Sequence, residues 1–302
     1  MATFSPTDAA FEGFRITREK PQALLAWAIV YLAFSLLMAV LLITLFGPLL
    51  TELAALEAQG GSEDPAEAMA MLGKLGPMYA LLVPLGLGVI AVWSAAVYRV
   101  VLRPGEGGLG YMRLGGDELR LALLMFIYIL LAMAFVFAVT FVAGLLSVFA
   151  ASAGGPVGGL LAFLIGVGAL CLFVYMSVRL SLAGPQTFAE RRLRLFDSWR
   201  LTKGSFWRLF GAYLLALVLA IVVVLLGMVI YAATAAVLTG GNLEAVGRVF
   251  QPDMTSVASY FTPAMMIYAV FGAFLGAVQN AVIYAPAAVA YRSLVGGGDA
   301  KP

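Results

Sequence analysis

The chain has 302 residues, of which 63% are hydrophobic and 11% are charged, and its formal net charge is +2. Soluble domains are about 45–50% apolar and about 25% charged, so this composition excludes an ordinary soluble protein and indicates a membrane protein. The apolar runs are continuous rather than alternating, which excludes a transmembrane β-barrel and predicts membrane-spanning helices.

Missing residue types exclude several kinds of chemistry. The chain has no histidine and a single cysteine, Cys171, inside an apolar run. Histidine-based acid–base catalysis, Ser-His-Asp triads and histidine-ligated metals are therefore excluded, as is an internal disulfide. No GxSxG and no GxxxxGK[ST] motif occurs, and the basic residues are too thinly spread for nucleic-acid binding. We expect no enzymatic activity, no cofactor and no metal.

The chain opens with signals for a short helix before the first apolar run. Ser5 suits the N-cap position and Pro6 the first helical position. Phe11 and Phe14 follow about one turn apart, with two arginines close by. We predict an amphipathic helix that lies on the membrane surface.

Six apolar segments then follow, each long enough to cross the bilayer as a helix. They cover residues 24–50, 77–101, 119–148, 160–182, the main part of 206–238, and 263–291. The sequence therefore predicts an all-α integral membrane protein with six transmembrane helices.

The segments between the spans differ in character. The first, residues 51–76, is acidic and contains an Asp64-Pro65 pair typical of a helix start. The glycine-rich stretch 103–118 is expected to be a flexible loop, with Asp117 as the cap of the third span.

Charge is sorted to one side of the predicted membrane. Of the 18 lysines and arginines, only Lys74 and Arg248 fall in loops on the side opposite the termini. Because cytoplasmic loops carry the excess of basic residues, we expect both termini to be cytoplasmic.

The segment 188–204, which we name the collar, contains a motif that recurs in the chain. Its FDSWRLTK at 196–203 is similar to FEGFRITR at 11–18, with a weaker echo, LGYMRLG, at 109–115. Each copy precedes apolar segments, so we expect one membrane domain, residues 1–302, built from three parallel helical hairpins. The approximate bounds of the hairpins are 6–103, 104–185 and 186–295.

Each hairpin also closes with tyrosine and arginine near the same side of the membrane. The pairs are Tyr98 with Arg99, Tyr175 with Arg179, and Tyr291 with Arg292. We expect these residues to be interfacial, with the arginines reaching toward the headgroups.

We predict that the collar is a basic amphipathic helix at the interface. Clusters of basic residues beside a span bind anionic headgroups, although they also serve simply to fix the topology. The candidate contacts for lipid headgroups are Arg15, Arg18, Arg113, Arg191, Arg192, Arg194, Arg200 and Lys203.

Gln279 and Asn280 form a candidate polar site within the sixth predicted span. They share an arc of the helix with Gly272 and Gly276, a GxxxG pair that permits close helix approach. The two amides would either line a substrate path or hydrogen-bond between helices, and Pro286 would loosen the helix one turn further on.

Carboxylates offer little basis for catalysis or ion coupling. The adjacent acids Asp117 with Glu118, and Glu63 with Asp64, are better explained by helix capping and solvation. No Asp or Glu lies in the centre of any span, which disfavours an ion-coupled transporter.

The stretch 179–215, with its aromatic-Arg-Leu-Thr-Lys pattern followed by Phe-Trp-Arg and a span, resembles a bacterial family. This family comprises the multi-span membrane domain that precedes some glycerophosphodiester phosphodiesterases, with stand-alone relatives of the YciC type. The resemblance implies a bacterial cytoplasmic (inner) membrane protein without assigned activity. The phosphodiesterase part of fused members relies on histidines, so the resemblance implies no enzyme here.

Our preferred hypothesis is a non-enzymatic polytopic inner-membrane protein that responds to lipid or scaffolds partners. Its expected partners are anionic membrane lipids, together with a protein partner or a second copy, and not nucleic acid. The alternatives are a permease or channel for a small or amphipathic solute and, with only the capping carboxylates in its favour, an intramembrane enzyme.

Overall fold

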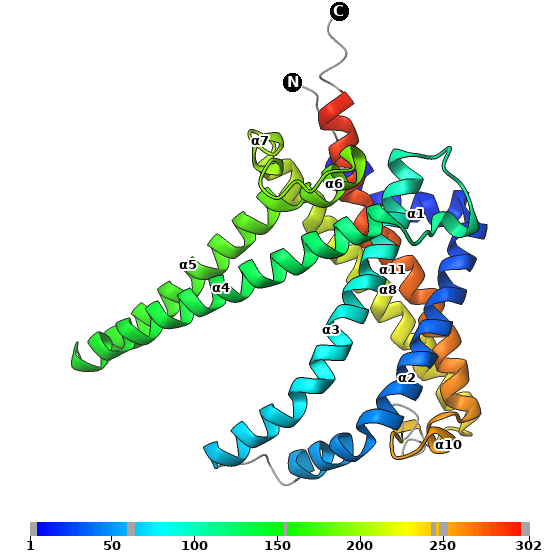
Figure 1. Ribbon diagram of the computed structural model, residues 1–302, viewed down its shortest axis with the longest axis horizontal. Coiled ribbons are helices and arrows are strands. Elements are labelled where there is room, and N and C mark those ends of the chain that lie inside the picture. Colours follow the sequence, from blue (N-terminus) through cyan, green and yellow to red (C-terminus); the bar gives the residue numbers. More distant parts are fainter. Residues whose placement is uncertain (1–4, 59–63, 154–155, 243–245, 248–252, 297–302) are drawn as a thin grey trace, which may run out of the picture.

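The computed structural model describes residues 5–58, 64–153, 156–242, 246–247 and 253–296. Within these ranges every regular element is a helix (Figure 1). This confirms the predicted all-α class.

Six helices are long and apolar enough to cross a membrane, which confirms the predicted number of spans. They are longer than their apolar segments; α2, with 38 residues, measures about 57 Å against a hydrocarbon core of about 30 Å. The helices are α2 (Pro21–Ala58), α3 (Pro65–Leu102), α4 (Gly116–Ala153), α5 (Pro156–Leu180), α8 (Phe206–Leu238) and α11 (Pro263–Gly296).

The predicted helix starts are confirmed at two positions. The Ser5 side chain accepts a hydrogen bond from the Asp8 amide at 3.3 Å, and the Asp64 side chain accepts one from the Ala66 amide at 2.8 Å. The short elements are α1 (Pro6–Glu19), η1 (Leu109–Tyr111), α6 (Ala183–Glu190), α7 (Ser198–Leu201) and α10 (Val257–Tyr260).

Helix α11 is at the centre of the packing and contacts α1, α2, α3 and α8. Its buried stripe consists of small side chains, which allow neighbouring backbones to come close. The stripe includes Ala273, Ala277, Ala281, Ala285 and Ala288.

Helix α1 packs on protein along the face opposite Phe11. Ala9 and Ile16 are buried, and Gly13 lies so close to α11 that an added Cβ would be 2.5 Å from the Val282 Cα. The helix itself is confirmed, and its position on the membrane surface stays a prediction. Phe11, on the face expected to meet the membrane, is 51% exposed.

The three predicted hairpins differ in how their helices pack. Helices α4 and α5 run side by side, whereas α2 and α3 stand apart over most of their length (Figure 1). Helix α2 packs mainly on α11 instead, so the first hairpin is held by a helix from the third.

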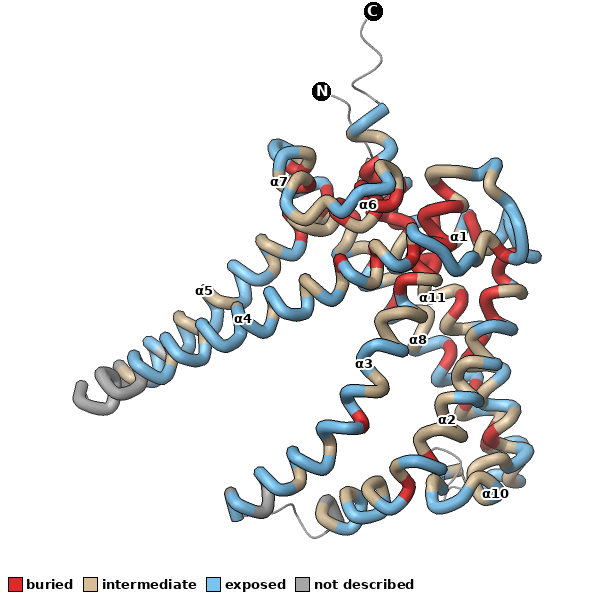
Figure 2. The backbone as a smooth tube through the Cα atoms, in the orientation of Figure 1, coloured by how far each residue is buried: buried red, intermediate tan, exposed pale blue. Residues whose placement is uncertain are grey.

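One end of the molecule carries α1, α6, α7 and the end of α11, and we call it the terminal side (Figure 1). Buried residues gather there, whereas the outer lengths of α4 and α5 are largely exposed (Figure 2). Large apolar side chains cover these outer lengths, as expected for helices surrounded by lipid.

Candidate functional site

A buried ion pair joins the first two hairpins at the terminal side. Arg99, near the end of α3, places its Nη2 2.6 Å from the Oε1 of Glu118 in the first turn of α4. The side chains are only 2% and 7% exposed. Arg99 also donates to the carbonyl of Tyr111. The arginine expected to reach toward headgroups is thus paired inside the protein.

Arg103 extends this connection to α6. Its guanidinium lies 3.0 Å from Asp117, donates to the Phe188 carbonyl at 2.6 Å, and stacks over the Phe188 ring at 4.4 Å. Asp117 lies inside the first turn of α4 and also pairs with Arg120, so its predicted role as the cap is wrong. We name Arg99, Arg103, Asp117 and Glu118 the polar layer.

Part of the glycine-rich loop is packed, contrary to the expected flexible loop. The buried Trp27 of α2 donates its indole N–H to the carbonyl of Gly110. Gly110 has a φ of 61°, which favours glycine, and an added Cβ would lie 2.7 Å from the Ala26 Cβ. The turn therefore fits closely against the start of α2.

The collar is not one helix, so that prediction is wrong. Helix α6 ends at Glu190, and Arg191 follows in the left-handed region with a φ of 54°. Helical structure resumes only for the four residues of α7. The chain leaves the helix here, and Arg192 is exposed.

Arg194 lies in this break and is held by two carboxylates. Its guanidinium is 2.7 Å from Asp197 and 2.7 Å from Glu190. The hydrogen bond to Asp197, together with the charge of Glu190, raises the pKa of Arg194 above its ordinary value. This side chain is therefore already neutralised by protein groups.

The eight candidate lipid contacts divide into two sets of four. In the paired set, Arg15 contacts Glu12, Arg113 and Arg191 contact Glu106, and Arg194 contacts Glu190 and Asp197. The unpaired set is exposed and has no carboxylate within 4.0 Å among the described residues. Its members are Arg18, Arg192, Arg200 and Lys203.

The three arginines that close the hairpins also have different surroundings. Arg99 is buried and paired, whereas Arg292 is exposed and donates to the Val101 carbonyl at 3.1 Å. Arg179, in the last turn of α5, is 93% buried (7% exposed) and stacks over Trp199 at 4.8 Å. Equivalent positions in the predicted repeat thus lie in three different environments.

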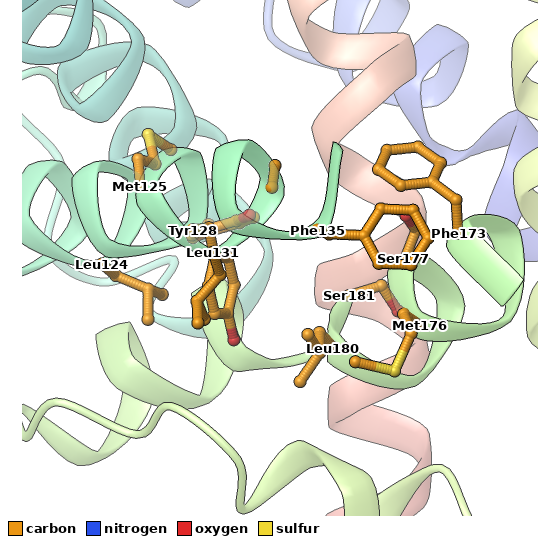
Figure 3. Close-up of a pocket in the computed structure, with 13 residues that line it drawn as sticks. Leu124, Met125, Tyr128, Leu131, Phe135, Phe173, Met176, Ser177, Leu180 and Ser181 are labelled. Atoms are coloured by element: carbon orange, nitrogen blue, oxygen red, sulfur yellow. The ribbon is translucent and has the colours of Figure 1, made fainter. Parts of the chain in front are cut away.

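A cavity of about 380 Å³ lies between α4 and α5, where the two helices approach α6 (Figure 3). Its walls are mainly apolar, with Leu131 and Phe135 facing Phe173 and Leu180. Two of its hydroxyl groups have partners in the protein: Tyr128 donates to the Leu195 carbonyl, and Ser181 accepts from Tyr213. The cavity suits hydrocarbon better than a polar solute.

The candidate polar site in α11 is only partly assembled. Gln279 borders an apolar cavity of about 460 Å³ between α8 and α11, while Asn280 does not line it. Both amides are half-buried. Of the GxxxG pair, Gly276 lies against the Tyr31 ring of α2, with an added Cβ 2.8 Å away, whereas Gly272 faces open space.

Of the two pairs of adjacent acids that were considered for catalysis, the described members have structural partners. Asp64 caps α3, and Asp117 and Glu118 bind arginines, while Glu63 lies outside the described residues. No group of three or more His, Cys, Asp or Glu side chains that could hold a metal ion occurs in the described part of the chain.

Sequence reasoning missed the polar layer and the environment of Arg179. It treated Arg99 and Arg179 as equivalent interfacial residues, and Glu118 as a carboxylate at a helix start. The one available signal was the concentration of charge in residues 99–120, where four arginines lie close in sequence to three acids.

No family model, no curated protein and no solved structure matches the chain.

Proposed function

We propose that this is a non-enzymatic polytopic protein of the bacterial inner membrane that responds to anionic lipids. Its terminal side would face the cytoplasm, and the same basic surface would serve a protein partner or a second copy. We include the YciC-like resemblance in this proposal. The resemblance rests on residues 179–215 alone.

The observation that carries the proposal is the unpaired set in the collar. Arg192, Arg200 and Lys203 are exposed without a carboxylate partner among the described residues. Trp207 nearby is 77% exposed, and Phe196 is also exposed. Exposed aromatic rings beside free cations are typical of a surface at headgroup level.

The experiment compares two triple variants with the same change in net charge. One removes unpaired cations (Arg192→Gln, Arg200→Gln, Lys203→Gln), and the other removes paired cations (Arg15→Gln, Arg113→Gln, Arg191→Gln). Each protein is reconstituted, and its preference for spin-labelled phosphatidylglycerol over phosphatidylcholine is measured by electron paramagnetic resonance.

We expect the preference to fall by about tenfold in the unpaired triple variant and by no more than about twofold in the paired one. The reason is that a cation already neutralised by the protein has little attraction left for a headgroup. Equal losses would show that net charge alone matters, and an unchanged preference in both variants would exclude the lipid role.

A second candidate, a permease or channel for a small or amphipathic solute, is favoured by Gln279. Its amide borders the cavity between α8 and α11 and has no hydrogen bond to another described residue. A cysteine at Gln279, in a Cys171→Ala background, would react with a water-soluble maleimide if water reaches this cavity. The lipid-facing Phe274→Cys is the control, and equal inertness of both would exclude this candidate.

A further inference from the structure

Arg179 is a buried cation without a counter-ion. It is 93% buried (7% exposed), and no carboxylate of the described residues lies within 4.0 Å of its guanidinium. Its Nε, like that of Arg99, is buried and makes no hydrogen bond to a described residue. A buried charge is normally paired or hydrogen-bonded, because removing it from water is costly.

Arg99 shows how the same chain treats the equivalent position in another hairpin. There the guanidinium is matched by Glu118 and by the Tyr111 carbonyl. At Arg179 the described residues supply the faces of two rings, Trp199 at 4.8 Å and Tyr175 at 5.9 Å, and the end of helix α5, without a carboxylate. Rings and a helix terminus hold a cation in place but leave its hydrogen-bond donors unused.

The surroundings indicate which anion could complete the site. Leu172 and Tyr175 lie about two turns and one turn before Arg179, on the same side of α5, and both are exposed. The collar lies beside Arg179 through Trp199, and its acids Glu190 and Asp197 are paired with Arg194. A guanidinium therefore lies at the boundary between an apolar surface and a basic one.

We propose that Arg179 binds the phosphate of one membrane phospholipid, whose acyl chains lie along the exposed side of α5. The planar guanidinium matches two phosphate oxygens, and Trp199 and Tyr175 fix its orientation. This deepens the lipid-responsive function proposed above by naming a specific site. A free phosphate ion shares the headgroup chemistry but would gain nothing from the apolar surface beside it.

Native mass spectrometry of the purified full-length protein tests the proposal. Phosphatidylglycerol is titrated, and the dissociation constant of the first bound lipid is compared among the wild type, Arg179→Gln, Arg179→Lys, the unpaired triple variant and Arg113→Gln. Arg113 is the matched control, because it is an exposed arginine that is already paired with Glu106.

We expect Arg179→Gln to weaken the first lipid by about tenfold, with Arg179→Lys in between and Arg113→Gln within about twofold of the wild type. A first lipid that is weakened in the unpaired triple variant but unchanged in Arg179→Gln overturns this site and leaves the lipid-responsive surface intact. If instead Arg179→Gln weakens phosphatidylglycerol and phosphatidylcholine equally, the site stands and the preference for anionic lipid fails.

Two further measurements use the wild type alone, so they do not depend on how the variants fold. Diacylglycerol has the same chains without phosphate, and we expect it to bind at least about tenfold more weakly. Inorganic phosphate in millimolar excess should not displace the lipid. Equal binding of diacylglycerol, or displacement by phosphate, would overturn the assignment to a lipid phosphate.

Discussion

At the scale of single residues, the main feature is the contrast between a matched and an unmatched buried arginine. The Arg99–Glu118 pair is out of water on both sides, so each charge depends on the other. Replacing one partner alone leaves a buried charge, whereas replacing both with apolar side chains removes that penalty.

We therefore expect Glu118→Leu to lower the free energy of unfolding by about 3–5 kcal/mol, and the double variant Arg99→Met/Glu118→Leu to recover most of the loss. Tryptophan fluorescence during denaturant titration in micelles measures both. The exposed Lys74–Glu52 pair is the control, and Glu52→Leu should cost less than about 1 kcal/mol. A double variant as unstable as Glu118→Leu would contradict this account.

At the scale of elements, α1 can pack closely on α11 because Gly13 has no side chain at the contact. The atoms nearest an added Cβ at Gly13 belong to the main chain of Val282 and Ala281, which cannot turn aside. Without such a contact, replacing glycine by alanine stabilises a helix by about 1 kcal/mol. The sign of the change in unfolding free energy therefore shows whether the contact is present.

Gly13→Ala should accordingly destabilise the protein by about 1–3 kcal/mol despite its better helix propensity. Gly272→Ala, in α11 with open space around it, should be neutral or stabilising by up to about 1 kcal/mol. Thermal unfolding in detergent compares the two variants. If they shift the midpoint in the same direction, the close packing of α1 on α11 is not present in solution.

The break in the collar belongs to the same scale. Sequence periodicity places Phe188, Leu195 and Trp199 on one arc and so predicts a continuous helix. The structure instead turns at Arg191 because Arg103 binds the Phe188 carbonyl and Arg194 binds acids on either side of the turn. The contact between Arg103 and Phe188 joins residues far apart in sequence, and periodicity carries no information about it.

At the scale of the whole molecule, hydropathy was sufficient to predict six helices, because hydrocarbon forces each apolar run to satisfy its backbone internally. The helix starts at Ser5 and Asp64 were also readable, since capping is local. The separation of α2 from α3 could not be predicted from the sequence, because it depends on the packing of both helices on α11. Arg179 was missed for the same reason: the presence of a partner is a tertiary property.

The threading of the chain gives a prediction at this scale. A fluorescent protein fused after residue 302 should fluoresce, and alkaline phosphatase fused there should be inactive, because the basic side of the protein stays in the cytoplasm. Alkaline phosphatase joined after Asn242, between α8 and α10, should be active. The reverse pattern would invert the membrane orientation and place the collar outside the cell.

The tight clustering of buried residues at the terminal side has a mechanical consequence. The outer lengths of α3, α4 and α5 are largely exposed, and few contacts outside the α4–α5 pair hold them. We therefore expect a change in bilayer thickness to tilt these helices about the polar layer, with the ion pairs of that layer kept intact. Such a tilt would move the end of α5, where Arg179 lies beside the exposed cations of the collar.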